Sequence, residues 1–279
     1  METQQKKVLG PIINALATPE QLKASQTRGL SWPSIVALHH LGGSLIQLAG
    51  SILALPISTI ATATILFHRF HLVVSFYEHS IRDTAAACLF IASKVCEFPL
   101  RPGITLGAIN TAAQDPLAIG GSKVQKEDGT NLGTQTLYTT ELQILTTLAF
   151  DTHVVTPYTL CVEYLNSMRI EEARKKTIAQ RAWNYVNDSL NTRICILHQP
   201  NTIAVTALWL AGRELDIELL DGERWWTAFD VNTEDMGHIF LLLREGRDTA
   251  IKERDRVVSG EEPGLTVQDV LKRLKQESS

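Results

Sequence analysis

Forty consecutive residues, from Gly29 to His68, contain no Asp, Glu, Lys or Arg, although charged residues make up 20% of the chain. A run of this kind is either a membrane segment or part of a buried core. A membrane-spanning helix needs about 20 apolar residues in a row. Here Pro56 divides the run, and polar residues such as Gln47 and Ser58 interrupt each half. The run therefore predicts two core helices and no membrane span.

The apolar residues of the run recur at helical spacing. In the first half, three- and four-residue steps connect Ile35, Leu38, Leu41, Leu45, Leu48 and Ile52. Proline ends a helix and is well placed to begin the next one. A second helix is therefore predicted to follow Pro56 and to leave the uncharged run at Arg69.

Three more helices complete a first unit. The segment from Ala85 to Lys94 is apolar around its whole circumference, which is typical of the central helix of a bundle. A fourth helix is expected at 103–113 and a fifth at 136–149, with a glycine-rich loop at 115–133 between them. On the fifth helix, Glu141 lies along the side that carries Leu137, Leu145 and Leu148.

The second part of the chain repeats this plan, which matters because internal repeats decide architecture. When Ala85 is set on Ala204, four further pairs coincide: Leu89 with Leu208, Phe90 with Trp209, Ala92 with Ala211, and Lys94 with Arg213. No segment alternates with the two-residue period of a half-buried strand. The sequence predicts an all-α protein of two tandem five-helix bundles, with an N-terminal extension and a short amphipathic C-terminal helix near 265–274.

The composition excludes several classes of function. The net charge is −4, whereas a generic nucleic-acid binder carries a basic stripe, so no direct nucleic-acid binding is expected. The four cysteines have neither C-x-x-C pairing nor a histidine spacing that suits zinc, which indicates reduced thiols and no metal. The start of the chain is polar, so no secretory leader is expected. No catalytic constellation and no cofactor site is predicted, and a binding protein is favoured.

Two charged residues lie on helices of the first unit at positions where burial of a charge would cost free energy. Lys94 ends the most apolar helix, and Glu141 lies on the fifth helix of the same unit. Each has an ordinary explanation, because a lysine can complement a helix dipole or extend toward solvent, and a glutamate can be a solvated surface residue. Their role is decided by the motifs around them.

Taken together, these motifs resemble the cyclin box. The segment Ala92–Pro99 resembles the cyclin signature whose lysine follows the central helix. Thr140–Leu145 and Leu148–Asp151 resemble the fifth helix with its partner glutamate and terminal Phe-Asp. Phe150–Tyr158 resembles the linker between the two cyclin folds. The similarity is greatest to transcription-type cyclins of the L group, then the K group, on the segments Leu45–Gly50, Leu66–Phe70, Ala182–Leu190, Gln199–Ala204 and Arg224–Phe229.

The resemblance implies a noncatalytic, activating subunit that forms a heterodimer with the catalytic subunit of a cyclin-dependent serine/threonine kinase. It implies a nuclear protein acting in RNA polymerase II transcription. Pre-mRNA processing stays open, because the sequence has no Arg-Ser-rich tail. Carried over by motif, Lys94 and Glu141 are polar clamps on the kinase's regulatory helix, and Glu97 orders the activation loop. The apolar contacts are Val95, Leu145 and Phe150. The implied domains are an extension at 1–33, the N-terminal cyclin box at 34–152, the C-terminal cyclin fold at 153–246, and a charged linker with the last helix at 247–279.

Two departures from the family pattern affect these expectations. Cys96 stands where the family usually has Glu, which removes an acceptor near the activation loop. The first helix carries Val36–His40 in place of the apolar patch with which cell-cycle cyclins dock substrates, so no docking of that kind is expected.

Two other classes of function remain as alternatives. A cyclin-fold adaptor or general-transcription-factor-like protein would bind peptides or DNA complexes without a kinase, and would need a basic face or a peptide groove. A hydrolase using Cys or His would need a catalytic constellation.

Overall fold

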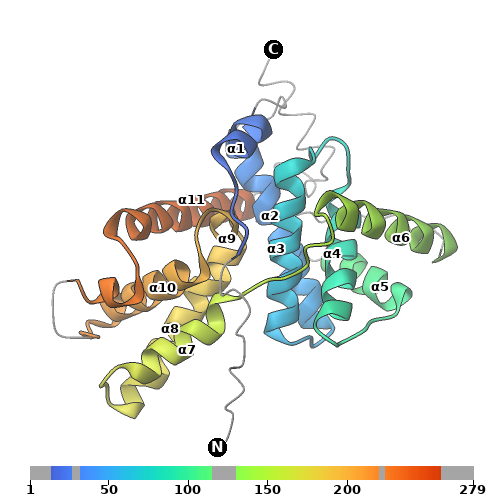
Figure 1. The fold of residues 1–279 in the computed structure, drawn as a ribbon. Helices are drawn as coiled ribbons and strands as arrows, with labels where there is room; N and C mark the ends of the chain where they lie inside the picture. Colours follow the sequence, from blue (N-terminus) through green and yellow to red (C-terminus); the bar gives the residue numbers. More distant parts are fainter. Residues whose placement is uncertain (1–13, 27–31, 115–129, 220–223, 259–279) are drawn as a thin grey trace, which may run out of the picture.

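Every regular element in the described part of the chain is a helix. The computed structural model describes residues 14–26, 32–114, 130–219 and 224–258 (Figure 1). An N-terminal helix α1 (Pro19–Gln26) precedes a first group formed by α2 (Trp32–Ile52), α3 (Ile57–Val73), α4 (Ile81–Val95), α5 (Pro102–Ala112) and α6 (Thr130–Thr147). The second group is formed by α7 (Pro157–Ser167), α8 (Glu172–Leu190), α9 (Ile194–Leu197), α10 (Pro200–Leu215), the 3-10 helix η1 (Trp225–Phe229) and α11 (Thr233–Val258). The predicted all-α fold of two five-helix bundles is confirmed.

Helix α4 lies at the centre of the first bundle, where it contacts α2, α3, α5 and α6. Its small residues allow this close approach, because Ala85, Ala87 and Ala92 have no exposed surface. Ser80 caps its start by accepting a hydrogen bond from the backbone N–H of Asp83. The prediction of a buried, alanine-rich central helix is confirmed.

The uncharged run forms α2 and α3, which separate at Pro56 as predicted. The window Ile35–Ile52 of α2 is long and apolar enough to cross a membrane, but half of it is buried inside the protein. A core helix passes the same test of length and composition, so the window is weak evidence for a span. The run supplies much of the first core, including Leu38, Ile46, Leu66 and Phe67. Its missing charges are therefore explained by burial between helices.

The crossing of α2 and α3 depends on Gly42. A Cβ atom at this position would lie 2.0 Å from Cζ of Phe67, whose side chain is fully buried. We expect Gly42→Ala to lower the free energy of unfolding by about 3 kcal/mol, because the ring has no space into which to move. Gly107→Ala is the matched control on α5, where nothing lies within 4 Å of the added atom. It should raise stability by about 0.5–1 kcal/mol. Urea unfolding followed by circular dichroism measures both, and equal effects would contradict this packing.

The second bundle repeats the first around α10, which contacts α7, α8, α9, α11 and η1. The predicted sequence repeat extends to a side-chain interaction. Lys94 Nζ lies 4.2 Å from the ring centroid of Phe90, and the Arg213 guanidinium lies 5.5 Å from that of Trp209. Each central helix thus ends with a cation over the aromatic ring one turn earlier.

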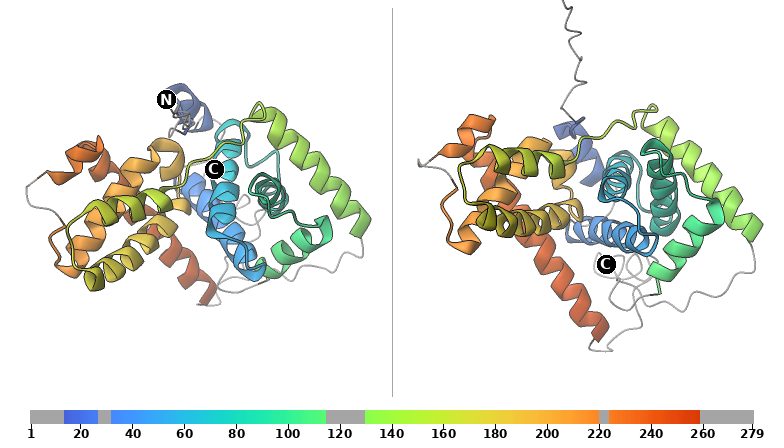
Figure 2. Two further views of the ribbon diagram at one scale, coloured as in Figure 1. Left: turned by 60° about the horizontal axis from the view of Figure 1, so that its bottom comes forward. Right: turned by 90° about the horizontal axis from the view of Figure 1, so that it is seen from below.

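Helix α3 packs into both cores, and hydrogen bonds of Asn14, near the N-terminus, connect the two bundles. Ala61 and Ile65 of α3 pack into the second core, and Figure 2 shows α2 and α3 between the second bundle and α4–α6. Buried Asn14 exchanges two hydrogen bonds of 2.8 Å with Val155 of the linker. It also exchanges two of 3.0 Å with Gln199, the residue before α10. Sequence periodicity does not predict these hydrogen bonds of Asn14.

Two helix boundaries differ from those expected. Helix α6 begins at Thr130, inside the predicted loop, and α11 continues beyond Gly246 to Val258. The charges that suggested a linker after Gly246 instead lie on a helix, since charged residues are good helix formers. The predicted C-terminal helix lies outside the described residues.

Candidate functional site

The ends of α4 and α6 are built in the same way. Glu97 has a φ of 61°, its N–H donates to the Lys94 carbonyl (3.2 Å), and the N–H of Phe98 donates to the Ser93 carbonyl (2.7 Å). At the end of α6, Ala149 has a φ of 50°, and the N–H of Phe150 donates to the Leu145 carbonyl (2.7 Å). Both are Schellman motifs, made here without glycine. They fix the direction in which the chain leaves each helix.

Lys94 and Glu141 meet across the contact between α4 and α6. The Lys94 ammonium donates to Oε1 of Glu141 in an ion pair. The lysine side chain is 43% exposed and the glutamate side chain 13%. The sequence singled out both charges, and the structure brings them together.

This ion pair leaves hydrogen-bonding capacity on both sides. An ammonium has three donors and a carboxylate has two acceptor oxygens. One donor and Oε1 are used in the pair. The lysine is partly exposed, so its remaining donors are within reach of a partner, and the second carboxylate oxygen is not used in the pair. The site therefore offers hydrogen-bonding groups to a partner.

Exposed apolar side chains lie on the same parts of α4 and α6 as the charged pair, and at the end of α6. Phe150 is 63% exposed and Leu142 is 59% exposed, and Val95 and Tyr138 are also exposed. Leu145 is half-buried and packs against the core. We call these five residues, together with Lys94 and Glu141, the clamp face. Exposed hydrophobic residues that gather on neighbouring helix turns are typical of a protein interaction site.

The sequence predicts part of this face, namely Val95, Leu145 and Phe150, but not Tyr138 and Leu142 of α6. The signal was present, because Tyr138, Leu142 and Leu145 recur at helical spacing beside the stripe that enters the core. A second apolar stripe on an amphipathic helix is easily taken for a wider core face.

Cys96 and Glu97 are adjacent in the chain, but their side chains lie in different surroundings. The half-buried thiol of Cys96 points back toward α3, where its Sγ lies 3.7 Å from Oγ1 of Thr62. Glu97 is exposed at the left-handed position that follows. A glutamate in place of Cys96 would start from a position that faces the fold, so Glu97 is the acidic residue available at this end of α4.

Replacing Glu97 with glycine should stabilise the protein. A left-handed conformation costs a residue with a Cβ about 1–2 kcal/mol, part of which glycine loses again as backbone entropy. We therefore expect Glu97→Gly to raise the free energy of unfolding by about 0.5–1 kcal/mol. Glu97→Ala is the control, since it removes the carboxylate and keeps the Cβ. Thermal unfolding compares the two, and equal stability of both variants would contradict the assigned strain.

The buried thiols are poor nucleophiles. Burial raises the pKa of Cys161 and of Cys195 to about 12, and burial also raises the pKa of Cys88. At neutral pH these thiols stay protonated. No group of three or more His, Cys, Asp or Glu in the described residues could hold a metal ion.

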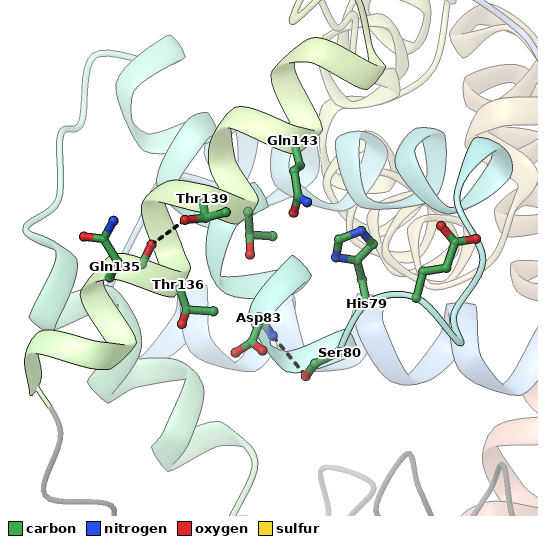
Figure 3. Close-up of a pocket in the computed structure, with 9 residues that line it drawn as sticks. His79, Ser80, Asp83, Gln135, Thr136, Thr139 and Gln143 are labelled. Atoms are coloured by element: carbon green, nitrogen blue, oxygen red, sulfur yellow. Dashed lines mark hydrogen bonds between the residues drawn. The ribbon is translucent and has the colours of Figure 1, made fainter.

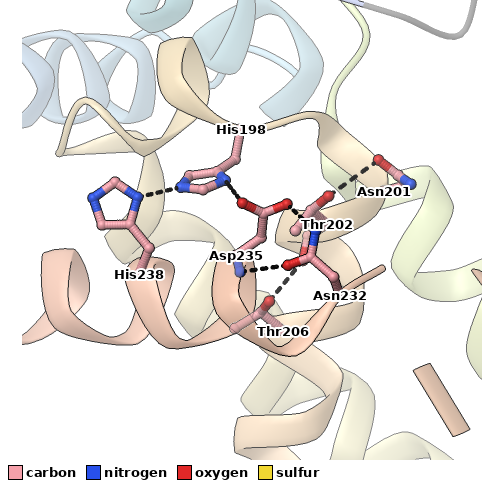
Figure 4. Close-up of polar contacts among 7 residues, drawn as sticks. All are labelled: His198, Asn201, Thr202, Thr206, Asn232, Asp235 and His238. Carbon is pink, nitrogen blue, oxygen red and sulfur yellow. Dashed lines mark hydrogen bonds and ion pairs between the residues drawn. The ribbon is translucent and has the colours of Figure 1, made fainter. Parts of the chain in front are cut away.

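In the described part of the second bundle, a histidine and a carboxylate lie close together, as an acid–base pair would (Figure 4). His198 Nδ1 lies 3.7 Å from Oδ1 of Asp235, and His198 Nε2 lies 2.9 Å from Nδ1 of His238. The Asp235 backbone N–H donates to Oδ1 of Asn232 (2.7 Å), and Oδ2 of Asp235 accepts from the Asn232 amide (2.8 Å). This network caps the start of α11 and fixes it to the end of α9, so its role is structural.

Comparison with known proteins agrees with the motifs. The model of the cyclin N-terminal domain matches residues 44–153. Human cyclin-L1 is 36% identical over 224 residues, which cover 78% of this chain and 41% of that protein. Human cyclin-L2 is 32% identical over 243 residues, which cover 85% of this chain and 45% of that protein. The chain thus spans less than half the length of these relatives.

The fold has counterparts among solved structures. A chain of the yeast RNA Pol II CTD kinase complex CTDK-1 superposes with a TM-score of 0.67 at 16% identity, covering 96% of this chain and 84% of that one. A chain of the CAK complex from Chaetomium thermophilum gives 0.60 at 17% identity, covering 93% and 84%. At such low identity the likeness concerns the fold.

The double five-helix fold and the matched domain model define a cyclin-type protein. The chain belongs to the cyclin family. Within that family it resembles the L-type cyclins, as its motifs predicted.

Proposed function

We propose that this chain is the regulatory, noncatalytic subunit of a cyclin-dependent serine/threonine kinase, with which it forms a heterodimer. The observation that carries the proposal is the Lys94–Glu141 pair, set among exposed apolar side chains where α4 and α6 meet. The resemblance to L-type cyclins supports a nuclear complex acting in RNA polymerase II transcription. Residues 34–152 then form the part of the chain that holds the kinase.

The clamp face has the chemistry to hold a helix of the kinase. The first turn of a helix has N–H groups without a partner in the helix, and the residues that lead into it have free carbonyl groups. The spare donors of Lys94 can bind such carbonyl groups, and the second carboxylate oxygen of Glu141 can bind such N–H groups. In this proposal Val95, Leu145 and Phe150, with Leu142 beside them on α6, pack against its apolar side, and Glu97 contacts the activation loop. The hydrogen bonds set the position of the helix, and the apolar contacts supply most of the binding free energy.

The proposal is tested by capture of the kinase from nuclear extract. The tagged wild-type chain and a Lys94→Ala/Glu141→Ala variant are used side by side, and bound proteins are identified by mass spectrometry. We expect one cyclin-dependent kinase to be enriched on the wild-type chain and strongly reduced on the variant. Equal capture by both would contradict the clamp, and the absence of any such kinase would contradict the function.

A further inference from the structure

Helix α11 is apolar on all sides over one stretch, residues 239–243. These residues go round the helix more than once, because each residue turns it by about 100°. The inner side is covered, since Ile239 is buried and Leu242 and Leu243 pack against the second core. On the outer side, Phe240 is 44% exposed and Leu241 is 52% exposed. A helix that is apolar all round is normally covered on every side, so a partner is expected on the outer side.

The outer side of α11 also has room for a second helix. Gly237 lies one turn before Leu241, and nothing lies within 4 Å of a Cβ atom placed there. The distance between two packed helices depends on the side chains between them, and a glycine permits a close approach. We call Gly237, Phe240 and Leu241 the outer patch. Figures 1 and 2 show α2 and α3 between α11 and α6, so the outer patch is separate from the clamp face.

The chain itself contains a segment with a matching apolar stripe. Residues 259–279 follow α11 directly and lie outside the described residues. The sequence predicts a short amphipathic helix at 265–274, in which apolar residues recur at three- and four-residue steps. These residues are Val267, Val270, Leu271 and Leu274. An apolar stripe of this kind needs a surface on which to pack.

The segment is long enough to fold back onto the outer patch. Seven residue steps connect Val258, the end of α11, to Leu265, and an extended chain of that length spans up to about 24 Å. The middle of the predicted helix lies beside Leu241 if Leu265 lies beside Gly246. Gly246 is about 18 Å back along α11 from Val258. A distance of about 10 Å between the helix axes lengthens this path to about 21 Å, which is within the span.

Charges on the two elements match in this antiparallel arrangement. The face of α11 that carries the outer patch begins with exposed Glu234, two turns before Leu241. After the outer patch, the same face is exposed and net positive, with Arg244, Asp248 and Lys252. The segment has two glutamates at 261–262, which lie beside the positive part of α11. Its three basic residues within 272–275 lie near Glu234.

Two other surfaces fit the apolar stripe less well. Figure 3 shows a hollow between the start of α4 and α6, and every residue that lines it is polar. The clamp face is apolar in part, but it contains the ion pair of Lys94 and Glu141. It also lies beyond α2 and α3 from the helix to which the segment is joined. The outer patch is both apolar and close to the start of the segment.

We propose that residues 265–274 form a helix that docks antiparallel on the outer patch of α11 in the same chain. The apolar stripe covers Phe240 and Leu241, and the two charged ends of the segment lie beside opposite charges of α11. The docked helix completes the cover of α11 and leaves the clamp face open. The outer patch is then closed to a second copy of the chain.

Hydrogen exchange of the full chain, measured by mass spectrometry, tests the docking. The isolated peptide 259–279 provides the reference rate. We expect the backbone amides of residues 267–274 to exchange at least about tenfold more slowly in the chain than in the peptide, because a docked helix exchanges only when it opens.

A matched pair of double variants locates the surface on which the segment docks. Phe240→Gln/Leu241→Gln should remove most of the slowing, and the exposure of both side chains keeps the fold intact. Tyr138→Gln/Leu142→Gln changes an aromatic residue and a leucine on α6 that are 47% and 59% exposed. This control should keep the slowing of the wild type.

Four results would overturn the proposal. The first is exchange of residues 267–274 as fast as in the peptide, and the second is slowing that survives Phe240→Gln/Leu241→Gln. The third is slowing that Tyr138→Gln/Leu142→Gln removes, which would place the segment on the clamp face. The fourth is slowing that grows with protein concentration, which would place it on a second copy. No kinase takes part in these measurements, so their outcome is independent of the proposed function.

Discussion

The chain is expected to lose about 4 kcal/mol of unfolding free energy between pH 7.5 and pH 5, through His68 and His71 alone. Burial lowers the pKa of His68 to about 4 and that of His71 to about 3, from an ordinary value of 6.5. The unfolded chain therefore binds more protons in acid than the folded one. Stability is complete above about pH 6.5 and falls as the pH approaches 4. Each histidine contributes about 2 kcal/mol at pH 5.

Burial is the main cause of the low pKa of His68, and its contact with His39 adds to the effect. His68 Nε2 donates to the Leu190 carbonyl at 2.8 Å, and His68 Nδ1 lies 2.8 Å from His39 Nδ1. In the neutral state this pattern assigns the proton between the two rings to His39. Adding a proton to His68 would place two N–H groups face to face in a fully buried site. Burial also lowers the pKa of His39, which adds to the effect.

Urea unfolding at pH 7.5, 6 and 5 measures the acid effect. His71→Phe keeps the stacking on Phe76, whose ring centroid lies 3.9 Å away, and removes the titrating group. We expect this variant to recover about 2 kcal/mol of the loss at pH 5. His153→Gln, at an exposed position, should show the wild-type pH profile. The same unfolding free energy at pH 5 and pH 7.5 would contradict the assigned burial of neutral histidines.

Replacing either Lys94 or Glu141 with alanine is expected to weaken kinase binding by about 2–5 kcal/mol. Lys94→Ala leaves Glu141, whose side chain is 13% exposed, as an uncompensated carboxylate under the partner. Glu141→Ala leaves the ammonium without its acceptor. Since both changes break one pair, the double variant should lose much less than the sum of the single losses. Isothermal titration of the purified kinase with each variant measures these free energies.

A matched pair of charges provides the control for the clamp. Lys175 and Glu172 form an ion pair of 3.0 Å on α8, in the second bundle. Lys175→Ala/Glu172→Ala removes the same two kinds of charge and should leave kinase binding unchanged. A loss at this site equal to the loss at the clamp would show a general charge effect and would count against the assigned interface.

The core of the fold could be predicted from the sequence because burial leaves a periodic trace. The uncharged run, its division at Pro56 and the match of Ala85 with Ala204 were enough for two helical bundles. The hydrogen bonds between Asn14 and Val155 leave no periodic pattern in the sequence, because they join single polar groups that are 141 residues apart. Local patterns carry no information about such pairs.

The candidate site was predicted in part for the same reason. Lys94 and Glu141 were conspicuous as charges on apolar helices, and their ion pair follows from the packing of α4 on α6. Tyr138 and Leu142 were missed, since apolar residues on a helix suggest a core before they suggest an interface.

Kinase activity in a reconstituted system tests the central claim most directly. The kinase captured by the chain is purified alone, and its phosphorylation of an RNA polymerase II tail-repeat peptide is measured while the chain is added. We expect the phosphorylation rate to rise as the chain is added and to saturate when the kinase is fully bound. The Lys94→Ala/Glu141→Ala variant should reach this increase only at much higher concentration. A rate that does not change when the wild-type chain saturates the kinase would contradict the account.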